Sequence, residues 1–195
     1  MSAESRQDRV ARWQKRVEEA PDSAAAHFNL GLAHTERGRM MAAEKAYRRA
    51  LELDPDLVQA WVNLGGALLM KWDFQGCLEA NQEAIRRQED LLVAHYNMGQ
   101  AHLYLKDAEQ LVRCNRRVLE LEESHPAAHY FLAVGLLATD QVEEARAECS
   151  RAASLGYQPR PEFLKSLDRA EKAMVQKVTT SVSPEAEADG DAKEE

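Results

Sequence analysis

The sequence predicts an all-α protein built from repeated units. One short pattern, "AHFNLG" at 26–31, returns as "AWVNLG" at 60–65, "AHYNMG" at 94–99 and "AHYFLA" at 128–133, a fixed step of 34 residues. Periods of this length are typical of repeats that fold by stacking on their neighbours. Within each copy apolar residues recur at the helical spacing i, i+3, i+4 and i+7, and no β-type alternation competes. The composition, 45% hydrophobic and 30% charged, is that of a helix-rich chain.

Four units of this period follow one another. They cover 24–57, 58–91, 92–125 and 126–159. The first unit carries Leu30 and Gly31, then Ala43, Tyr47 and Ala50, and closes at Pro55. These residues resemble the tetratricopeptide repeat, whose small-residue columns let two antiparallel helices approach closely. The resemblance extends over all four units.

The resemblance implies an α-solenoid of four tetratricopeptide-type helical hairpins. The first helices are expected at 24–37, 58–71, 92–105 and 126–138, and the second helices at 40–53, 74–87, 108–121 and 141–154. Some columns depart from the family pattern. Where the family prefers Trp the chain has His27, Trp61, His95 and His129, and where it prefers an aromatic ring it has Tyr47, Asn81, Asn115 and Cys149. Trp72 stands where a small turn residue, as at Gly38, is expected. Unusual packing of the middle repeats is therefore predicted.

Additional helices are predicted at both ends of the repeats. Residues 1–23 include Val10, Trp13 and Val17 at helical spacing, which indicates an N-terminal capping helix. After the stop signal at Gly156, the segment 160–177 sets Phe163, Leu167, Ala170 and Met174 on one stripe, as expected of a C-terminal capping helix. Residues 178–195 lack a core-forming pattern and are predicted to be a disordered acidic tail.

Charge and cysteine content narrow the function. The net charge is −8, and arginine pairs alternate with glutamates, so no basic face for nucleic acid is predicted. No apolar stretch indicates a membrane span or a secretory signal, and a cytoplasmic location is expected. Cys77, Cys114 and Cys149 are far apart and show no metal-ligand spacing, so they are interpreted as reduced, buried thiols.

Each first helix carries two apolar stripes. The stripe through His27, Leu30, Gly31 and His34 recurs in the later units and is interpreted as packing within the solenoid. In the family the second stripe lines the concave inner surface, so the resemblance implies a peptide-binding groove there. The predicted groove residues are Phe28, Asn29, Leu32, Val62, Asn63, Val93, Tyr96, Asn97, Gln100, Tyr104, Tyr130 and Phe131.

Asn29, Asn63 and Asn97 form a ladder within this second stripe, which ends at Phe131. A carboxamide both donates and accepts hydrogen bonds, which suits the N–H and C=O groups of an extended peptide. The alternative is a purely structural role, with the asparagines bonding between adjacent helices. The sub-family that clamps the C-terminal carboxylates of chaperone clients is excluded, because its basic groove residues are missing here.

The pattern favours a binding protein over an enzyme. The pairs His27/His34 and His95/His102 are two helical turns apart, which is too far for ordinary chelation on one helix, so no metal is predicted. No phosphate loop or nucleophile motif is present, and no cofactor or catalytic residue is expected. The preferred hypothesis is a cytoplasmic interaction module or adaptor that binds a peptide or helix of a partner protein in the groove. The alternative is a self-assembling homo-oligomeric scaffold; a subunit that regulates an enzyme would use the same groove.

Overall fold

The computed structural model describes the backbone of residues 6–181 and the side chains of residues 9–177. Within residues 6–181 all regular structure is α-helical. The helices are α1 (Arg6–Glu19), α2 (Ala24–Thr35), α3 (Met40–Leu53), α4 (Val58–Met70), α5 (Phe74–Arg87), α6 (Leu92–Leu105), α7 (Ala108–Leu121), α8 (Pro126–Ala138), α9 (Val142–Ser154) and α10 (Pro161–Ser181). The predicted first and second helices of all four units are confirmed to within two residues at each end.

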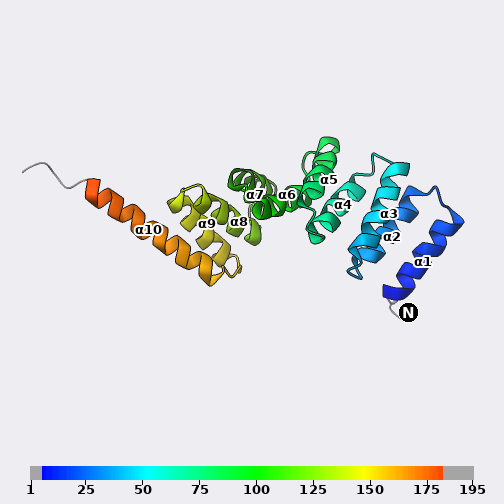
Figure 1. Ribbon diagram of the computed structural model, residues 1–195, viewed down its shortest axis with the longest axis horizontal. Helices are drawn as coiled ribbons and strands as arrows, with labels where there is room; N and C mark the ends of the chain where they lie inside the picture. Colours follow the sequence, from blue (N-terminus) through cyan, green and yellow to red (C-terminus); the bar gives the residue numbers. More distant parts are fainter. Residues whose placement is uncertain (1–5, 182–195) are drawn as a thin grey trace, which may run out of the picture.

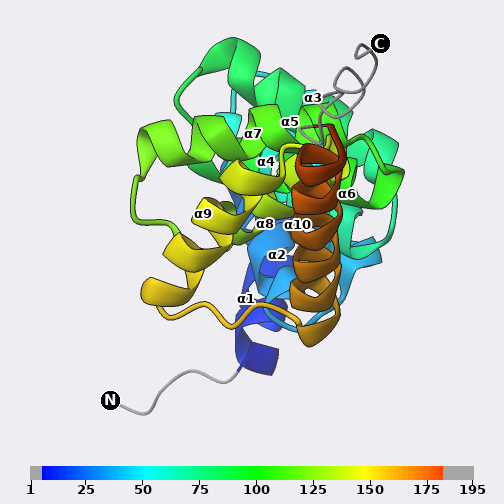
Figure 2. The same cartoon turned by 90° about the vertical axis from the view of Figure 1, so that its left-hand side faces the viewer.

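The helices form an elongated solenoid. Helices α2 and α3, α4 and α5, α6 and α7, and α8 and α9 pack as hairpins that follow one another along the long axis (Figure 1). Successive first helices also contact each other, α2 with α4, α4 with α6 and α6 with α8. Viewed along the axis, the second helices α5, α7 and α9 lie toward one rim of the molecule (Figure 2). The all-α solenoid predicted from the repeat is therefore confirmed.

Each hairpin turns at a residue with left-handed backbone geometry. The four residues occupy one column of the repeat: Gly38 (φ 68°), Trp72 (φ 64°), Lys106 (φ 60°) and Asp140 (φ 62°). Glycine adopts this conformation without strain, whereas for a residue with a side chain the conformation costs roughly 1–2 kcal/mol of free energy. The second helices that follow are capped at two of these turns, because Asp73 accepts from the N–H of Gly76 and Asp107 from that of Gln110.

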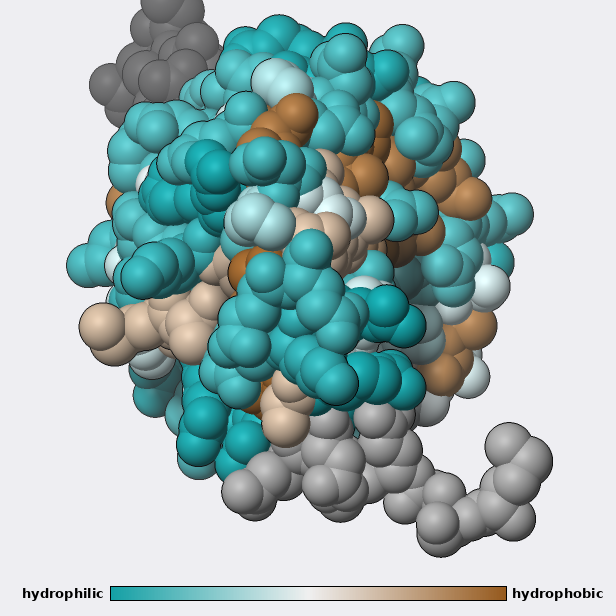
Figure 3. Space-filling model, turned by 90° about the vertical axis from the view of Figure 1, so that its right-hand side faces the viewer, coloured by the Kyte–Doolittle hydropathy of each residue, from teal (hydrophilic) through white to brown (hydrophobic). Residues whose placement is uncertain are grey.

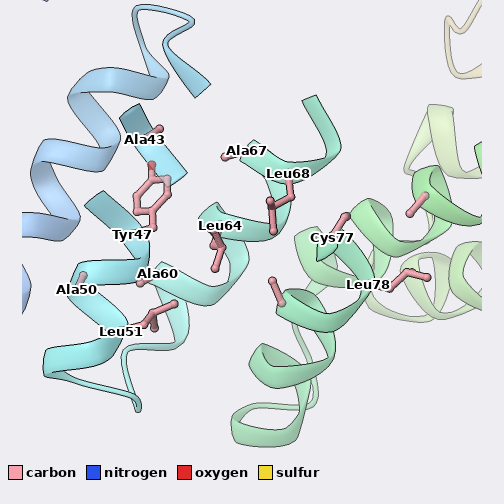
Figure 4. Close-up of a cluster of buried hydrophobic side chains, with 12 residues drawn as sticks. Ala43, Tyr47, Ala50, Leu51, Ala60, Leu64, Ala67, Leu68, Cys77 and Leu78 are labelled. Carbon is pink, nitrogen blue, oxygen red and sulfur yellow. The ribbon is translucent and has the colours of Figure 1, made fainter. Parts of the chain in front are cut away.

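The core of the first two hairpins is built mainly from alanine and leucine, with one tyrosine and one cysteine, Cys77. Tyr47 is fully buried between the hairpins, beside Leu64 and Leu68 of α4 (Figure 4). Its ring lies directly over Gly31, where a Cβ would come within 2.4 Å of the ring. The same arrangement recurs in the next two hairpins, where the equivalent glycines, Gly65 and Gly99, face Asn81 and Asn115 of their second helices. The middle repeats thus keep the close contact between their two helices, but an asparagine side chain packs against the glycine in place of the tyrosine ring.

The terminal helices close the ends of the solenoid. Helix α1 packs on α2 with Val10 buried, and it ends at Glu19 rather than continuing toward residue 23. Helix α10 packs on α9 and buries Leu167 completely. It continues to Ser181, so the predicted helix end at 177 was too early, and residues 178–181 belong to the helix rather than to a disordered tail. The rest of the predicted tail lies outside the described residues.

Candidate binding surface

The four first helices share an uncharged surface. Helices α2, α4, α6 and α8 contain no Asp, Glu, Lys or Arg, whereas each second helix carries several. We call the side of these first helices that faces away from their own second helices the inner face. Of the predicted groove residues on these helices, Phe28, Leu32, Val62 and Tyr96 are partly exposed and Val93 is 54% exposed, while the ring of Phe28 also packs against Tyr47 of α3 at 5.9 Å. Figure 3, which views the molecule from the α1 end, shows hydrophobic surface gathered along one side of an otherwise hydrophilic outline.

Two of the predicted ladder residues have the same geometry. The amide nitrogen of Asn29 donates to the carbonyl oxygen of Ala25 at 2.7 Å, and that of Asn63 donates to Gln59 at 2.7 Å. A carbonyl oxygen only accepts, so the nitrogen of each side chain must point back along its own helix. The Oδ1 atoms of both side chains are therefore the groups left to accept a hydrogen bond from elsewhere.

Asn97 lies in a different environment. Its side chain is 9% exposed, against the partly exposed Asn29 and Asn63. Its amide nitrogen lies 3.4 Å from Oδ1 of Asn81 on α5. The same nitrogen lies beside Gly66 on α4, at a position 3.7 Å from where a Cβ atom of that residue would be. Asn97 thus connects two hairpins through a buried amide pair, which is the structural use that the sequence had left open.

The column changes to Phe131 at the next junction, where two buried polar atoms of the described residues have no hydrogen-bond partner. Asn115 occupies the position of Asn81 and Gln100 that of Gly66, one repeat later. Within the described residues, Oδ1 of Asn115 and Nε2 of Gln100 are buried without a hydrogen-bond partner. Phenylalanine has no hydrogen-bond donor, so the column offers Asn115 no counterpart of the Asn97 amide that bonds Asn81.

Phe131 instead joins an aromatic cluster that spans the last two hairpins. Tyr96 lies 6.3 Å from Phe131 between ring centroids, and Tyr130 stacks on Tyr157 at 4.7 Å and meets Phe163 of α10 at 5.3 Å. Burial raises the pKa of Tyr96 and of Tyr130 above the ordinary value. Tyr130 is only 4% exposed, because it is covered by the segment that leads into α10. Tyr130, predicted as a groove residue, is therefore covered in this structure, whereas Tyr96 and Phe131, like Tyr157 and Phe163, are partly exposed.

A second aromatic cluster lies at the turns. Tyr104 was predicted in the groove, but its ring stacks on Phe74 at 4.9 Å and meets Trp72 edge-on at 5.2 Å. Sequence reasoning noticed Trp72 only as a departure from the turn pattern and did not connect it with Phe74. The signal was available, because Trp72 replaces a turn glycine and Tyr104 lies two residues before the corresponding turn of the next repeat.

The histidines serve packing. His27 and His95 each use Nε2 on a backbone carbonyl six residues earlier, of Pro21 at 2.8 Å and of Glu89 at 3.0 Å. Burial lowers the pKa of His34 and of His102, which favours their neutral forms. Among the side chains that the structure describes, no group of three or more His, Cys, Asp or Glu residues could hold a metal ion. None of the described helices is both long enough and apolar enough to cross a membrane.

Comparisons with known proteins agree with this architecture. The tetratricopeptide repeat model matches residues 24–57. No curated protein matches the sequence. The structure of MamA 41-end from Desulfovibrio magneticus RS-1 aligns with a TM-score of 0.73 at 16% identity, over 77% of this chain and 85% of that one. PilF of Pseudomonas aeruginosa gives 0.71 at 22%, over 88% and 78%, and YrrB gives 0.68 at 19%, over 84% and 81%. The chain therefore has the tetratricopeptide-repeat fold, and its first hairpin carries the sequence pattern of that repeat.

Proposed function

We propose that this chain is a non-enzymatic interaction module that binds an uncharged, apolar peptide or helix of a partner protein on its inner face. The observation that carries the proposal is the complete absence of Asp, Glu, Lys and Arg from the four first helices. Such a surface gives a charged ligand no ion pair and makes its desolvation costly, whereas it rewards an apolar one. The tetratricopeptide repeat protein YrrB, of the same fold, is described as having a peptide-binding site, which supports this class of function.

The inner face has a polar end and an aromatic end. Oδ1 of Asn29 and Oδ1 of Asn63 are acceptors for backbone N–H groups, which every peptide offers. Tyr96 and Phe131 form the apolar anchor toward α8, and anchors of this kind carry most of the energy of an interface. We propose that Val93 and Tyr96 make the contacts that select the partner, while the asparagines hold its backbone.

The proposed setting is the cytoplasm. Support comes from Cys77, Cys114 and Cys149, which are free thiols and buried. Free cysteines are typical of proteins that live in a reducing compartment.

A displayed library of random peptides tests the proposal. Peptides selected on the full chain should be rich in Leu, Ile and Phe and poor in charge. Their affinity should be nearly the same at about 50 and 500 mM NaCl, because no ion pair contributes. Tyr96→Ala and Val93→Lys should each weaken binding by about tenfold or more, whereas the matched surface change Val175→Lys on α10 should not.

Three results would contradict the proposal. They are selection of charged peptides, binding that disappears in high salt, and equal affinity of the Val93→Lys and Val175→Lys variants. Light scattering on the same samples addresses the alternative of a self-assembling scaffold. A mass that rises with concentration, and returns to that of the monomer in Val93→Lys, would show that the inner face binds a second copy instead.

A further inference from the structure

A histidine caps the first turn of α8. Nδ1 of His125, the residue that precedes the helix, accepts a hydrogen bond from the backbone N–H of Ala128 at 3.1 Å. In the same column of the repeat, the side chain of Ser23 caps α2 in the same way, whereas Leu57 and Leu91 provide no side-chain cap. The cap alone therefore does not require histidine, because a serine also provides it.

The cap fixes the tautomer of the His125 ring. A backbone N–H only donates, so Nδ1 must carry a lone pair and no proton. In the neutral imidazole the proton is then on Nε2, which becomes a hydrogen-bond donor. Nε2 lies on the far side of the ring from Nδ1, so its N–H points away from the first turn of α8. Within residues 9–177, whose side chains the structure describes, no group accepts a hydrogen bond from this nitrogen.

The same ring lies beside the aromatic residues that anchor the partner in the proposed function. Its centroid is 5.2 Å from that of Tyr96, which lies 6.3 Å from Phe131, and all three rings are partly exposed. The other polar groups proposed to contact the partner, Oδ1 of Asn29 and Oδ1 of Asn63, are acceptors. His125 therefore adds a donor of fixed tautomer beside the apolar anchor.

We propose that His125 is a ligand-contact residue, and that its Nε2–H donates a hydrogen bond to a backbone carbonyl oxygen of the partner. The inference rests on the proposed function, in which an apolar side chain of the partner packs on Tyr96 and Phe131. The carbonyl belongs to that anchoring residue or to a residue next to it, because the His125 ring packs against the Tyr96 ring. A helix uses its interior carbonyls for its own hydrogen bonds, so the segment bound here is extended.

NMR tests the tautomer and the contact directly. The full chain, labelled with a nitrogen isotope at its histidines, is compared with and without a library peptide whose affinity falls in Tyr96→Ala. His125→Ser identifies the signals of the residue by removing them. At about pH 8, where imidazole is neutral, the free protein should show the Nε2–H tautomer, and the signal of that proton should move when the peptide binds. An Nδ1–H tautomer, or ring signals that the peptide leaves unchanged, would overturn the proposal.

Two substitutions separate the donor from the other roles of the ring. His125→Ser keeps a capping side chain and loses the donor, so it should melt close to the wild type. His125→Phe keeps a ring beside Tyr96 and loses both the cap and the donor. Each should weaken binding of the same peptide by about fivefold to tenfold, the usual effect of one hydrogen bond. Ser23→Ala, which removes the cap of α2, is the matched control and should bind as the wild type does.

Changes in the peptide identify the carbonyl and the conformation. An ester in place of one backbone amide weakens the carbonyl of that link as an acceptor. At one position beside the anchoring side chain, the ester should lower affinity for the wild type but not for His125→Ser. A hydrocarbon bridge that holds the peptide helical should abolish binding, because it occupies the backbone groups that an extended segment leaves available.

The possible failures have different meanings. If no selected peptide depends on Tyr96, the proposed function is wrong and this inference falls with it. If peptides that depend on Tyr96 bind His125→Ser as tightly as the wild type, the proposed function stands and the role of His125 is wrong. Weaker binding to His125→Ser but not to His125→Phe would assign the effect to ring packing instead of the donor. Peptides that bind only when they are held helical would also contradict the proposal.

Discussion

The indole Nε1 of Trp61 donates a hydrogen bond to the carbonyl oxygen of Pro55, six residues earlier, at 2.8 Å. The histidines of the same column make the equivalent contact: His27 with Pro21, His95 with Glu89 and His129 with Glu123, at 2.8 to 3.0 Å. The column therefore requires a ring N–H that reaches the end of the preceding unit, and imidazole and indole both supply it. This explains why histidine replaces the expected tryptophan three times without loss of the fold.

This relationship predicts a graded effect of removing the ring N–H. His129 is buried at 6% exposure, and its other ring nitrogen, Nδ1, contacts Glu148. His129→Phe should lower the free energy of unfolding by about 1–3 kcal/mol, because it leaves two part-buried acceptors without their donor. His27→Phe, at a partly exposed site, should cost less than about 1 kcal/mol because water replaces the lost donor. Urea denaturation measures both, and equal losses would contradict this explanation.

The ion pairs of Arg146 hold α10 to α9. Its guanidinium bonds Glu171 through Nε at 2.6 Å and through Nη2 at 2.7 Å, and it also contacts Asp168. The hydrogen bond from Arg146 lowers the pKa of Glu171 below its ordinary value of 4.5. A lowered folded-state pKa means that the stabilisation is present above pH 4.5 and is lost as the pH falls below it.

Arg146→Met should therefore lower stability at pH 7 by no more than about 1 kcal/mol, since the pair is partly exposed. The difference from wild type should shrink as the pH falls below 4.5 and Glu171 becomes protonated. Urea midpoints at several pH values measure this difference. Arg169→Met, an exposed change on α10, is the control and should show no such pH dependence.

The thiols should be unreactive in the folded protein. Burial raises the pKa of Cys77 to about 12 and that of Cys114 to about 11, and it also raises the pKa of Cys149. The thiolate is the reactive form, so a disulfide reagent at pH 8 should modify almost none of them until urea unfolds the chain. Rapid modification of one cysteine in native buffer would show that the helix covering it opens readily.

The sequence predicted the helices well because each column of the repeat was observed four times. A position that is small or apolar in every unit, such as Ala26 and its equivalents, identifies the packed side of a helix without any structure. Contacts between units were harder, because they depend on how far each hairpin rotates against the next. The pairing of Asn97 with Asn81 and the meeting of Trp72 with Tyr104 both cross a junction, so column spacing alone could not reveal them.

Asn97 and Asn63 occupy the same column of the repeat, but we expect their replacement by alanine to change stability by different amounts. Asn97→Ala should lower stability by about 1–2 kcal/mol, because it leaves the buried Oδ1 of Asn81 without its donor. Asn63→Ala should change stability by less than about 0.5 kcal/mol, since its amide bonds only to Gln59 on its own partly exposed helix surface. Calorimetric melting compares the variants directly. A destabilised Asn63→Ala would assign a structural role to the whole column.

The last prediction concerns Phe131, where the column ends. Restoring the amide by Phe131→Asn removes ring contacts with Tyr96, Tyr130 and Tyr157, so the single variant should be less stable than wild type. It also places a donor beside the unpaired Oδ1 of Asn115, in the geometry that Asn97 and Asn81 already show. The loss caused by Phe131→Asn should therefore be smaller in the wild-type background than in Asn115→Val, by about 1 kcal/mol, the usual net contribution of one hydrogen bond. A double-mutant cycle in urea measures this coupling. Additive losses would mean that Phe131 does not occupy the place of the missing amide, and that Asn115 is unpaired for another reason.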